Sequence, residues 1–160
     1  MQRKLLFVTV GLVVATAAIA ANAHFVRGPD ASLDTRTGAV TVSWKEAGLG
    51  TNVLVDYEAS ADATVKYQCV NKGGNCPAAA NKQTVAGPVF AAGTFASGKN
   101  GSITASLTFD PPPATLNCPG GQRRALVSVS WSGIALSDVT NGVTAAASPS
   151  SLSMAGPECP

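Results

Sequence analysis

The stretch VTVSW at residues 40–44 alternates apolar and polar side chains, and VSVSW at residues 127–131 repeats that alternation. Successive side chains of a β-strand point to opposite faces, so Val40, Val42 and Trp44 share one face. The two stretches favour two core strands, each ending in a buried tryptophan. A duplicated unit is the alternative, and it rests on these two short matches alone.

The same alternation recurs outward along the chain, between residues that favour turns. About eight short strands are predicted, at 25–27, 39–45, 53–58, 65–69, 84–95, 103–109, 123–131 and 134–139. This spacing favours one all-β domain over residues 24–143, a single antiparallel β-sandwich with immunoglobulin-like Greek-key connections. Residues 144–160 are rich in Ser, Ala and Pro, and they are expected to form an unpatterned tail tied down by Cys159.

Residues 1–23 have the features of a secretory signal peptide. Arg3 and Lys4 precede an apolar run, and Ala21-Asn22-Ala23 matches the small-residue cleavage pattern. A transmembrane anchor is the alternative, but the strongly apolar part, residues 5–20, is short for a hydrocarbon core about 30 Å thick. Cleavage after Ala23 is therefore predicted, giving a secreted, extracellular protein with no membrane segment after cleavage.

The net charge argues against two classes of partner. Removing Arg3 and Lys4 leaves nine of the eleven basic residues against nine acidic residues, so the mature net charge is zero rather than +2. A domain without a basic excess has little attraction to nucleic acid or to an anionic membrane. An extracellular glycan or protein is the expected class of partner, and the sequence identifies neither.

The four cysteines of an exported chain predict two disulfides. A zinc site is the competitor, but it needs paired short spacings that this chain lacks. One pairing, Cys69–Cys118 with Cys76–Cys159, links the two halves and fastens the tail. The rival pairing is local, Cys69–Cys76 with Cys118–Cys159. Loop-closure entropy is worth roughly 4 kcal/mol for a loop of ~50 residues and nearer 2 kcal/mol for one of ~7, which favours the long-range set.

The sequence offers no convincing catalytic constellation, so the protein is expected not to be an enzyme and to use no cofactor or metal. His24 is the single histidine and would be the mature N-terminus, which leaves a serine–histidine–aspartate triad without a well-placed base. A two-histidine copper site lacks its second ligand, and weak copper binding at His24 alone remains open. Asp56 and Glu58 lie two residues apart on one strand face, as is typical of a solvated outer face.

Polar side chains gather around the Gly-Gly turn at residues 73–74 and form the candidate binding surface. Its members are Asn71, Lys72, Asn75, Asn81 and Lys82. Amide and ammonium groups on a disulfide-braced loop suit polar ligands such as sugar hydroxyls or peptide backbone. The alternative is that asparagine and glycine occur here because a turn requires them.

Several motifs carry resemblances to known families. The motifs CxNxGGNxP at 69–77, ANK at 80–82, GxNG at 98–101 and NCPxGQ at 117–122 resemble a group of small secreted microbial proteins common in actinobacteria. This resemblance covers nearly all of residues 24–160 and implies export and a β domain, but it implies no site.

A weaker likeness points to a different family. The motifs AGL at 47–49, GSITASLT at 101–108 and LSD at 136–138 are similar to neocarzinostatin-type apoproteins, secreted β-sandwiches that hold an enediyne chromophore. The cysteine spacing differs from theirs. The sequence therefore predicts a secreted, non-catalytic binding or surface-interaction module, with a small-molecule carrier or a secreted enzyme as alternatives.

Overall fold

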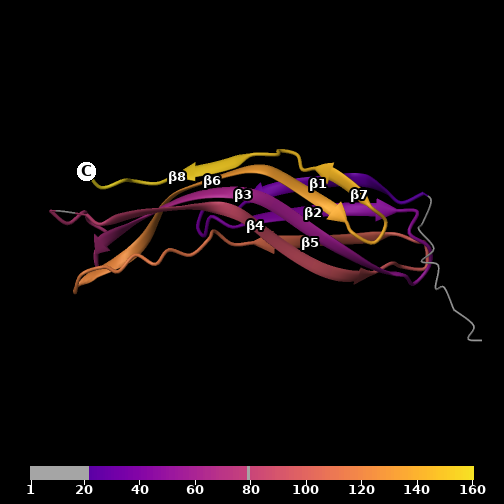
Figure 1. Ribbon diagram of the computed structural model, residues 1–160, viewed down its shortest axis with the longest axis horizontal. Coiled ribbons are helices and arrows are strands. Elements are labelled where there is room, and N and C mark those ends of the chain that lie inside the picture. Colours follow the sequence, from indigo (N-terminus) through magenta and orange to yellow (C-terminus); the bar gives the residue numbers. More distant parts are fainter. Residues whose placement is uncertain (1–21, 79) are drawn as a thin grey trace, which may run out of the picture.

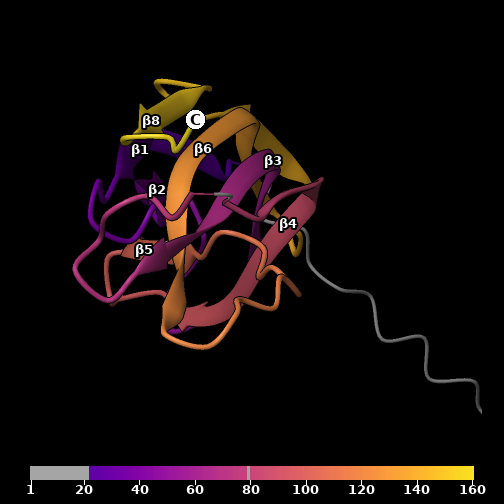
Figure 2. The same ribbon diagram turned by 90° about the vertical axis from the view of Figure 1, so that its left-hand side faces the viewer.

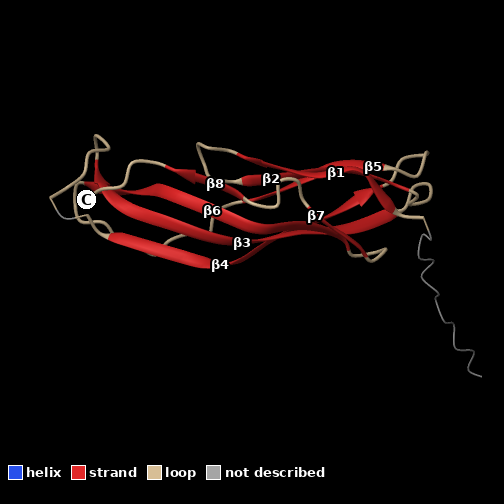
Figure 3. Cartoon of the chain, turned by 90° about the horizontal axis from the view of Figure 1, so that it is seen from above, coloured by secondary structure: helices blue, strands red, loops and turns tan. Residues whose placement is uncertain are grey.

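A computed structural model describes residues 22–78 and 80–160. The regular elements of this part of the chain are eight strands: β1 (His24–Leu33), β2 (Val40–Ala47), β3 (Leu54–Asn71), β4 (Lys82–Ala96), β5 (Ile103–Phe109), β6 (Gln122–Asp138), β7 (Val143–Ala146) and β8 (Leu152–Ala155). Figure 3 shows these strands joined by loops. The predicted all-β class is confirmed. The predicted signal peptide lies outside the described residues, apart from Asn22 and Ala23.

The strands form two sheets in which every pair is antiparallel. Sheet A has the order β1-β2-β5, and sheet B has the order β4-β3-β6-β7, with β8 also paired to β6. Figure 1 shows an elongated molecule, and Figure 2, viewed along its length, shows the two sheets as separate layers. The predicted sandwich is therefore confirmed. Sheet A covers the half of sheet B that lies nearer to the start of β1.

Two of the predicted strands, 53–58 and 65–69, are parts of the single strand β3. Between them, Ala59, Ala61 and Ala63 continue the inward alternation, and each is at most 6 % exposed. Alanine fits the narrow space between the sheets, but it has little strand preference of its own. The alternation in the sequence is therefore weak at residues 59–64, although the backbone there pairs with both neighbouring strands.

Strand β6 likewise joins the two segments predicted at 123–131 and 134–139. The pairing with β3 changes register here, because Ser60 pairs with Ala135 whereas Asp62 pairs with Ser132. Gly133 lies in this bulge with a φ of +63°, a conformation that glycine adopts at little steric cost. The bulge restores the alternation, so that Trp131 and Ile134 both point into the core.

The segment expected to be an unpatterned tail forms two short strands on sheet B. Strand β7 pairs with residues 135–138 of β6, and β8 pairs with residues 128–131. The two strands therefore lie end to end along the same edge of β6. Each strand is only four residues long, which is too short for a recognisable periodicity, and the neighbouring strand supplies the hydrogen-bonding partners that order them.

The two tryptophans of the opening stretches lie in the core, as predicted. Trp44 is 2 % exposed, and its ring centroid lies 4.7 Å from that of Tyr57 and 5.5 Å from that of Phe95. Trp131 is 1 % exposed, packs against Phe109 at 5.0 Å and donates its Nε1–H to the carbonyl oxygen of Gly38. Aromatic rings at these separations stabilise each other beyond the burial of their surface.

Both disulfides join residues that are distant in the sequence. Cys69 is bonded to Cys118 and Cys76 to Cys159, with Cα–Cα distances of 5.5 Å and 5.3 Å. The long-range pairing predicted from the sequence is confirmed, and the local alternative is excluded. The second bond fastens the C-terminal segment to the loop after β3, as expected.

Candidate functional site

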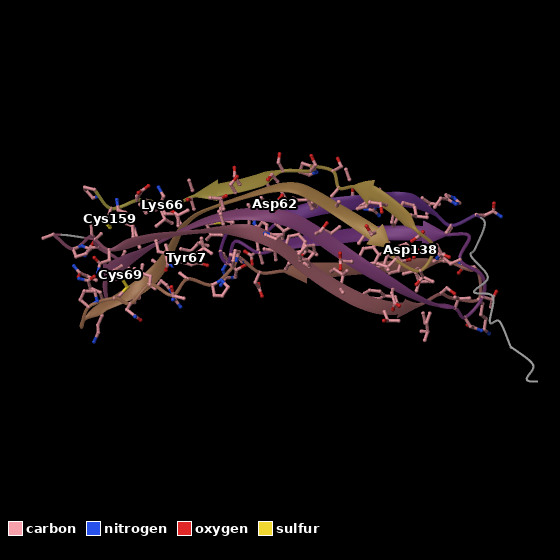
Figure 4. All side chains as sticks on the ribbon, viewed as in Figure 1. Asp62, Lys66, Tyr67, Cys69, Asp138 and Cys159 are labelled. Carbon is pink, nitrogen blue, oxygen red and sulfur yellow. A yellow bond between two sulfur atoms is a disulfide. The ribbon has the colours of Figure 1, made fainter. Side chains whose placement is uncertain are left out.

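The predicted binding loop lies at the end of the molecule that carries the disulfides. Figure 4 shows Cys69, Cys159, Lys66 and Tyr67 gathered at this end, and Asp138 toward the other. Within the loop, the N–H of Asn71 donates to the carbonyl oxygen of Asn75 at 2.9 Å, and the N–H of Gly74 donates to that of Asn71. These bonds close a tight turn, so the backbone of Asn71 and Asn75 serves the turn itself.

Two of the remaining members of the predicted surface, Asn81 and Lys82, also support local structure. The backbone N–H of Cys69 donates to the carbonyl oxygen of Asn81, and Lys82 Nζ donates to the carbonyl oxygen of Cys159 at 2.6 Å. Lys82 also forms an ion pair with Glu158 at 3.2 Å. Lys72 is exposed in the turn. The structure thus brings the five residues to one end of the sandwich, where Lys82 is used internally.

Glu158 sits between two lysines and holds the C-terminal segment on sheet B. Its carboxylate accepts hydrogen bonds from Lys66 and Lys82, at 3.0 Å and 3.2 Å for the closest contacts. These bonds, from Lys66 first and Lys82 second, lower the pKa of Glu158. The buried Gln68 also holds this segment, because its Oε1 accepts a hydrogen bond from the backbone N–H of Cys159 at 2.8 Å. Ion pairs and hydrogen bonds within the protein therefore hold the C-terminal segment at this end of the molecule.

A hollow of about 780 Å³ lies on the outer face of sheet A. We call it the outer hollow and define it by two rows of side chains that cross the three strands. The first row is Arg27, Lys45 and Thr104, and the second row is Asp30, Ser43 and Ser106. Each row takes one residue from β1, one from β2 and one from β5. No pattern in the sequence predicted this surface.

A bulge in β1 shapes the outer hollow. Arg27 pairs with Lys45 and Asp30 pairs with Ser43, so the two residues between them on β1 face the single residue Trp44 on β2. Gly28 has a φ of +71°, and a Cβ there would meet the carbonyl oxygen of Ser43 at 2.7 Å. Only glycine allows β1 to pass this close to β2. The bulge brings Arg27 and Asp30 onto the same outer face.

The charges of the outer hollow are incompletely paired. Arg27 Nε lies 3.8 Å from Asp30 Oδ2, and both side chains are more than half exposed. Lys45 is exposed, and it forms no ion pair or side-chain hydrogen bond with any residue of the described chain. The other polar residues of the lining carry hydroxyl groups, and the rest of the lining is apolar: Ser32, Ser43, Thr104 and Ser106, with Ala31, Trp44 and Ala105. The hollow therefore offers cationic groups and hydroxyl groups on a rigid sheet.

A second unexpected feature is a buried acid beneath sheet A. Glu46 is fully buried on β2, and its Oε2 accepts a hydrogen bond from Tyr57 Oη at 2.7 Å. Burial raises the pKa of Glu46 to about 7, the bond from Tyr57 opposes that rise, and the negative charge of Asp138 adds to it. Burial and the bond to Glu46 also raise the pKa of Tyr57.

One signal in the sequence could have revealed Glu46. The alternation that puts Val42 and Trp44 on the inner face continues to residue 46, so an acid occupies an inward position. Its neighbour Asp138 is also fully buried and accepts the backbone N–H of Asn141 at 2.8 Å, as expected for an aspartate beside a turn. Asp56 and Glu58 lie on the exposed face of β3, as predicted.

Other candidate chemistry is sparse in the described residues. Within residues 22–78 and 80–160, no three histidine, cysteine or carboxylate side chains lie in positions that could hold a metal ion. His24 is exposed at the start of β1, where its Nδ1 lies 2.7 Å from the carbonyl oxygen of Asn22. Across the same residues, no helix is long and apolar enough to span a membrane.

Comparisons with protein-family models, with curated proteins and with solved structures found no match for this chain. A functional proposal therefore has to rest on the geometry and the charges described above. Among those features, the outer hollow combines a concave shape, convergent polar groups and a cation, Lys45, that has no partner among the described residues, which is the combination typical of a ligand site.

Proposed function

We propose that this protein is an extracellular, non-catalytic binding module that holds a polar ligand in the outer hollow. The observation that carries the proposal is the convergence of the polar side chains of the two rows, from three strands, on a hollow of about 780 Å³. Sites for small ligands commonly have volumes of roughly 300–1,000 Å³ and a few well-placed polar groups. Because the lining residues lie on paired strands, their backbone is already ordered, and little conformational entropy is lost when a ligand binds.

Two disulfides support an extracellular location, since such bonds persist in oxidising compartments. The predicted signal peptide would deliver the chain there. The strand order also supports an immunoglobulin-like Greek key, because β2 pairs with β5 and β3 pairs with β6, so the chain crosses between the sheets in the way such sandwiches do. We include secretion and this fold relationship in the proposal.

A carrier of the neocarzinostatin type would instead need an open apolar cleft between the sheets. Trp44, Tyr57 and Phe95 pack on one another there, with ring centroids 4.7–5.9 Å apart. This packing favours binding on the outer face over binding between the sheets. The proposed ligand is therefore a polar molecule, such as an extracellular glycan, rather than an apolar one.

The proposal is tested by blocking the hollow with one bulky side chain. Ser43 lies at the centre of the second row, and Ser43→Tyr would fill the space above it. Ser130 is a matched control, because it is also an exposed serine on a strand paired at both sides, in sheet B. The purified mature protein is applied to a glycan array together with both variants.

The expected result is that wild type and Ser130→Tyr bind the same glycans, while Ser43→Tyr loses at least about tenfold in affinity, or about 1.4 kcal/mol. Circular dichroism spectra and urea midpoints confirm that both variants are folded. Equal binding by the two variants would remove the outer hollow as the ligand site.

A further inference from the structure

The first row of the outer hollow contains two cations placed directly opposite each other. Arg27 on β1 is the cross-strand partner of Lys45 on β2, and both side chains reach the outer face. Like charges at opposed positions of neighbouring strands destabilise the pairing. A bound anion would lie close to both positive charges, and its attraction to them would offset their mutual repulsion.

Groups within the protein relieve this repulsion only in part. Asp30 lies 3.8 Å from Arg27 Nε, but the pair is exposed, with side-chain exposures of 82 % and 53 %, and such surface pairs contribute little. The contrast with Lys66 and Lys82 is informative, because Glu158 contacts both of them at 3.0–3.2 Å. Lys45 has no equivalent partner among the described residues, so its ammonium group is available to a ligand.

The groups beside this row indicate what else the ligand carries. Ser43, Ser106 and Thr104 present hydroxyl groups, each of which can both donate and accept a hydrogen bond. Hydroxyl groups suit the polyhydroxylated surface of a sugar. A hollow of about 780 Å³ is also far larger than a single inorganic anion needs, since a water molecule takes up about 30 Å³ in the liquid.

We propose that the ligand of the outer hollow is an acidic oligosaccharide. Its anionic group would lie between Arg27 and Lys45, where the guanidinium can offer two parallel N–H donors. Its sugar hydroxyls would hydrogen-bond to Ser43 and Ser106 in the second row. This inference rests on the proposed function, because it names the class of ligand for the same site.

Carboxylated and sulfated sugars share the chemistry that this site recognises, so the experiment contains both. Isothermal titration calorimetry compares a hexagalacturonate, a sulfated hexasaccharide, neutral maltohexaose and inorganic phosphate as ligands of the mature protein. EDTA is present throughout, so that a bridging metal ion does not contribute. At least one acidic hexasaccharide is expected to bind about tenfold or more tightly than maltohexaose, and its affinity is expected to fall as the salt concentration rises, because screening weakens exposed charge pairs.

Three substitutions sharpen the test. Lys45→Met is expected to lower the affinity for the acidic sugar by about tenfold, because a charge-assisted contact is lost. Lys99→Met is the control, because Lys99 is an exposed lysine on the loop before β5 and does not line the hollow. Asp30→Asn is expected to strengthen binding by a few-fold, because it removes the carboxylate that competes for Arg27. A merely structural role for these residues would not give opposite signs.

The outcomes separate this inference from the proposed function. Equal binding of maltohexaose and the acidic sugars, lost in Ser43→Tyr, would overturn the acidic ligand while leaving the hollow as the site. Phosphate binding as tight as that of either sugar would overturn the oligosaccharide part of the inference. Binding of an acidic sugar that Lys45→Met and Ser43→Tyr both leave unchanged would overturn the inference and the proposed site together.

Discussion

Lys82, at the disulfide end of the molecule, and Lys45, in the outer hollow, are both lysines on strands, but their ammonium groups meet different surroundings. Lys82 contacts Glu158 and the carbonyl oxygen of Cys159, so its charge holds the C-terminal segment in place. Lys45 faces Arg27 across the strands and has no internal partner in the described chain. In the first region a lysine that looked available for binding instead supports the fold. A polar row on a strand, visible only once the register is known, can be the surface that is left for a ligand.

The largest expected effect comes from removing the disulfide that braces the first of these regions. The double variant Cys69→Ala/Cys118→Ala opens a covalent link across 49 residues, for which chain entropy predicts a loss of about 4 kcal/mol of stability. Urea denaturation measures this loss. Ligand affinity at the outer hollow is expected to be unchanged in whatever fraction remains folded, because sheet A carries no cysteine. An unchanged urea midpoint would show that this end is not the structural region described here.

The next effect compares the buried face of sheet A with the disulfide end by the sign of their pH dependence. The pKa of Glu46 is raised in the folded protein from about 4.5 to about 7, so the folded state holds its proton more tightly than the unfolded state does. Its contribution to stability is present below pH 4.5 and is lost as the pH rises to about 7, by an amount on the order of 3 kcal/mol. Glu46→Gln has a side chain that stays neutral at every pH, so it should remove this decrease in stability with rising pH. Urea midpoints of wild type and Glu46→Gln are compared between pH 4.5 and pH 8, and parallel curves would contradict the prediction.

A smaller effect of opposite sign is expected at the disulfide end. Hydrogen bonds from Lys66 and Lys82 lower the pKa of Glu158, so its contribution is present at neutral pH and is lost as the pH falls through that lowered pKa. Glu158→Gln should therefore lower the thermal midpoint slightly at pH 7 and leave it unchanged in strong acid. A larger loss in acid than at pH 7 would reverse the sign assigned here.

The smallest expected effect is the one that most clearly separates the two regions. The double variant Lys72→Ala/Asn75→Ala alters the exposed part of the loop that the sequence favoured for binding. It is expected to change the affinity for the acidic sugar less than about twofold, within the range of ordinary surface substitutions. Calorimetry with the same hexasaccharide measures this. A loss of about tenfold, as large as that expected for Lys45→Met, would move the ligand site to the loop.

Much of the fold could be predicted because apolar and polar residues alternate along most of the strands. The inward positions of Val40, Val42 and Trp44 follow from the pattern, and loop-closure entropy favours the long-range disulfides over the local pairing; the structure confirms both predictions. The alternation is hard to recognise at the alanines of residues 59–64 in β3, and the two strands of the C-terminal segment are only four residues long, which is why neither was predicted. Their order comes from neighbouring strands rather than from local preference.

The outer hollow could not be predicted from the sequence for a different reason. Its rows exist only because β1, β2 and β5 are neighbours in a fixed register, and the bulge at Gly28 sets that register. A sequence pattern fixes which face a side chain takes on its own strand, but not which residue on another strand lies beside it. Glu46 is the exception, since continuing the alternation by one step predicts an inward acid.

The central claim, that the ligand binds on the outer face of sheet A, is tested most directly by a nuclear magnetic resonance titration of the mature protein with the acidic hexasaccharide that binds most tightly. We expect the largest changes in amide chemical shift at residues of the two rows, led by Arg27, Lys45 and Ser43. Shift changes confined to Asn71, Lys72 and Asn75, with none in sheet A, would contradict it.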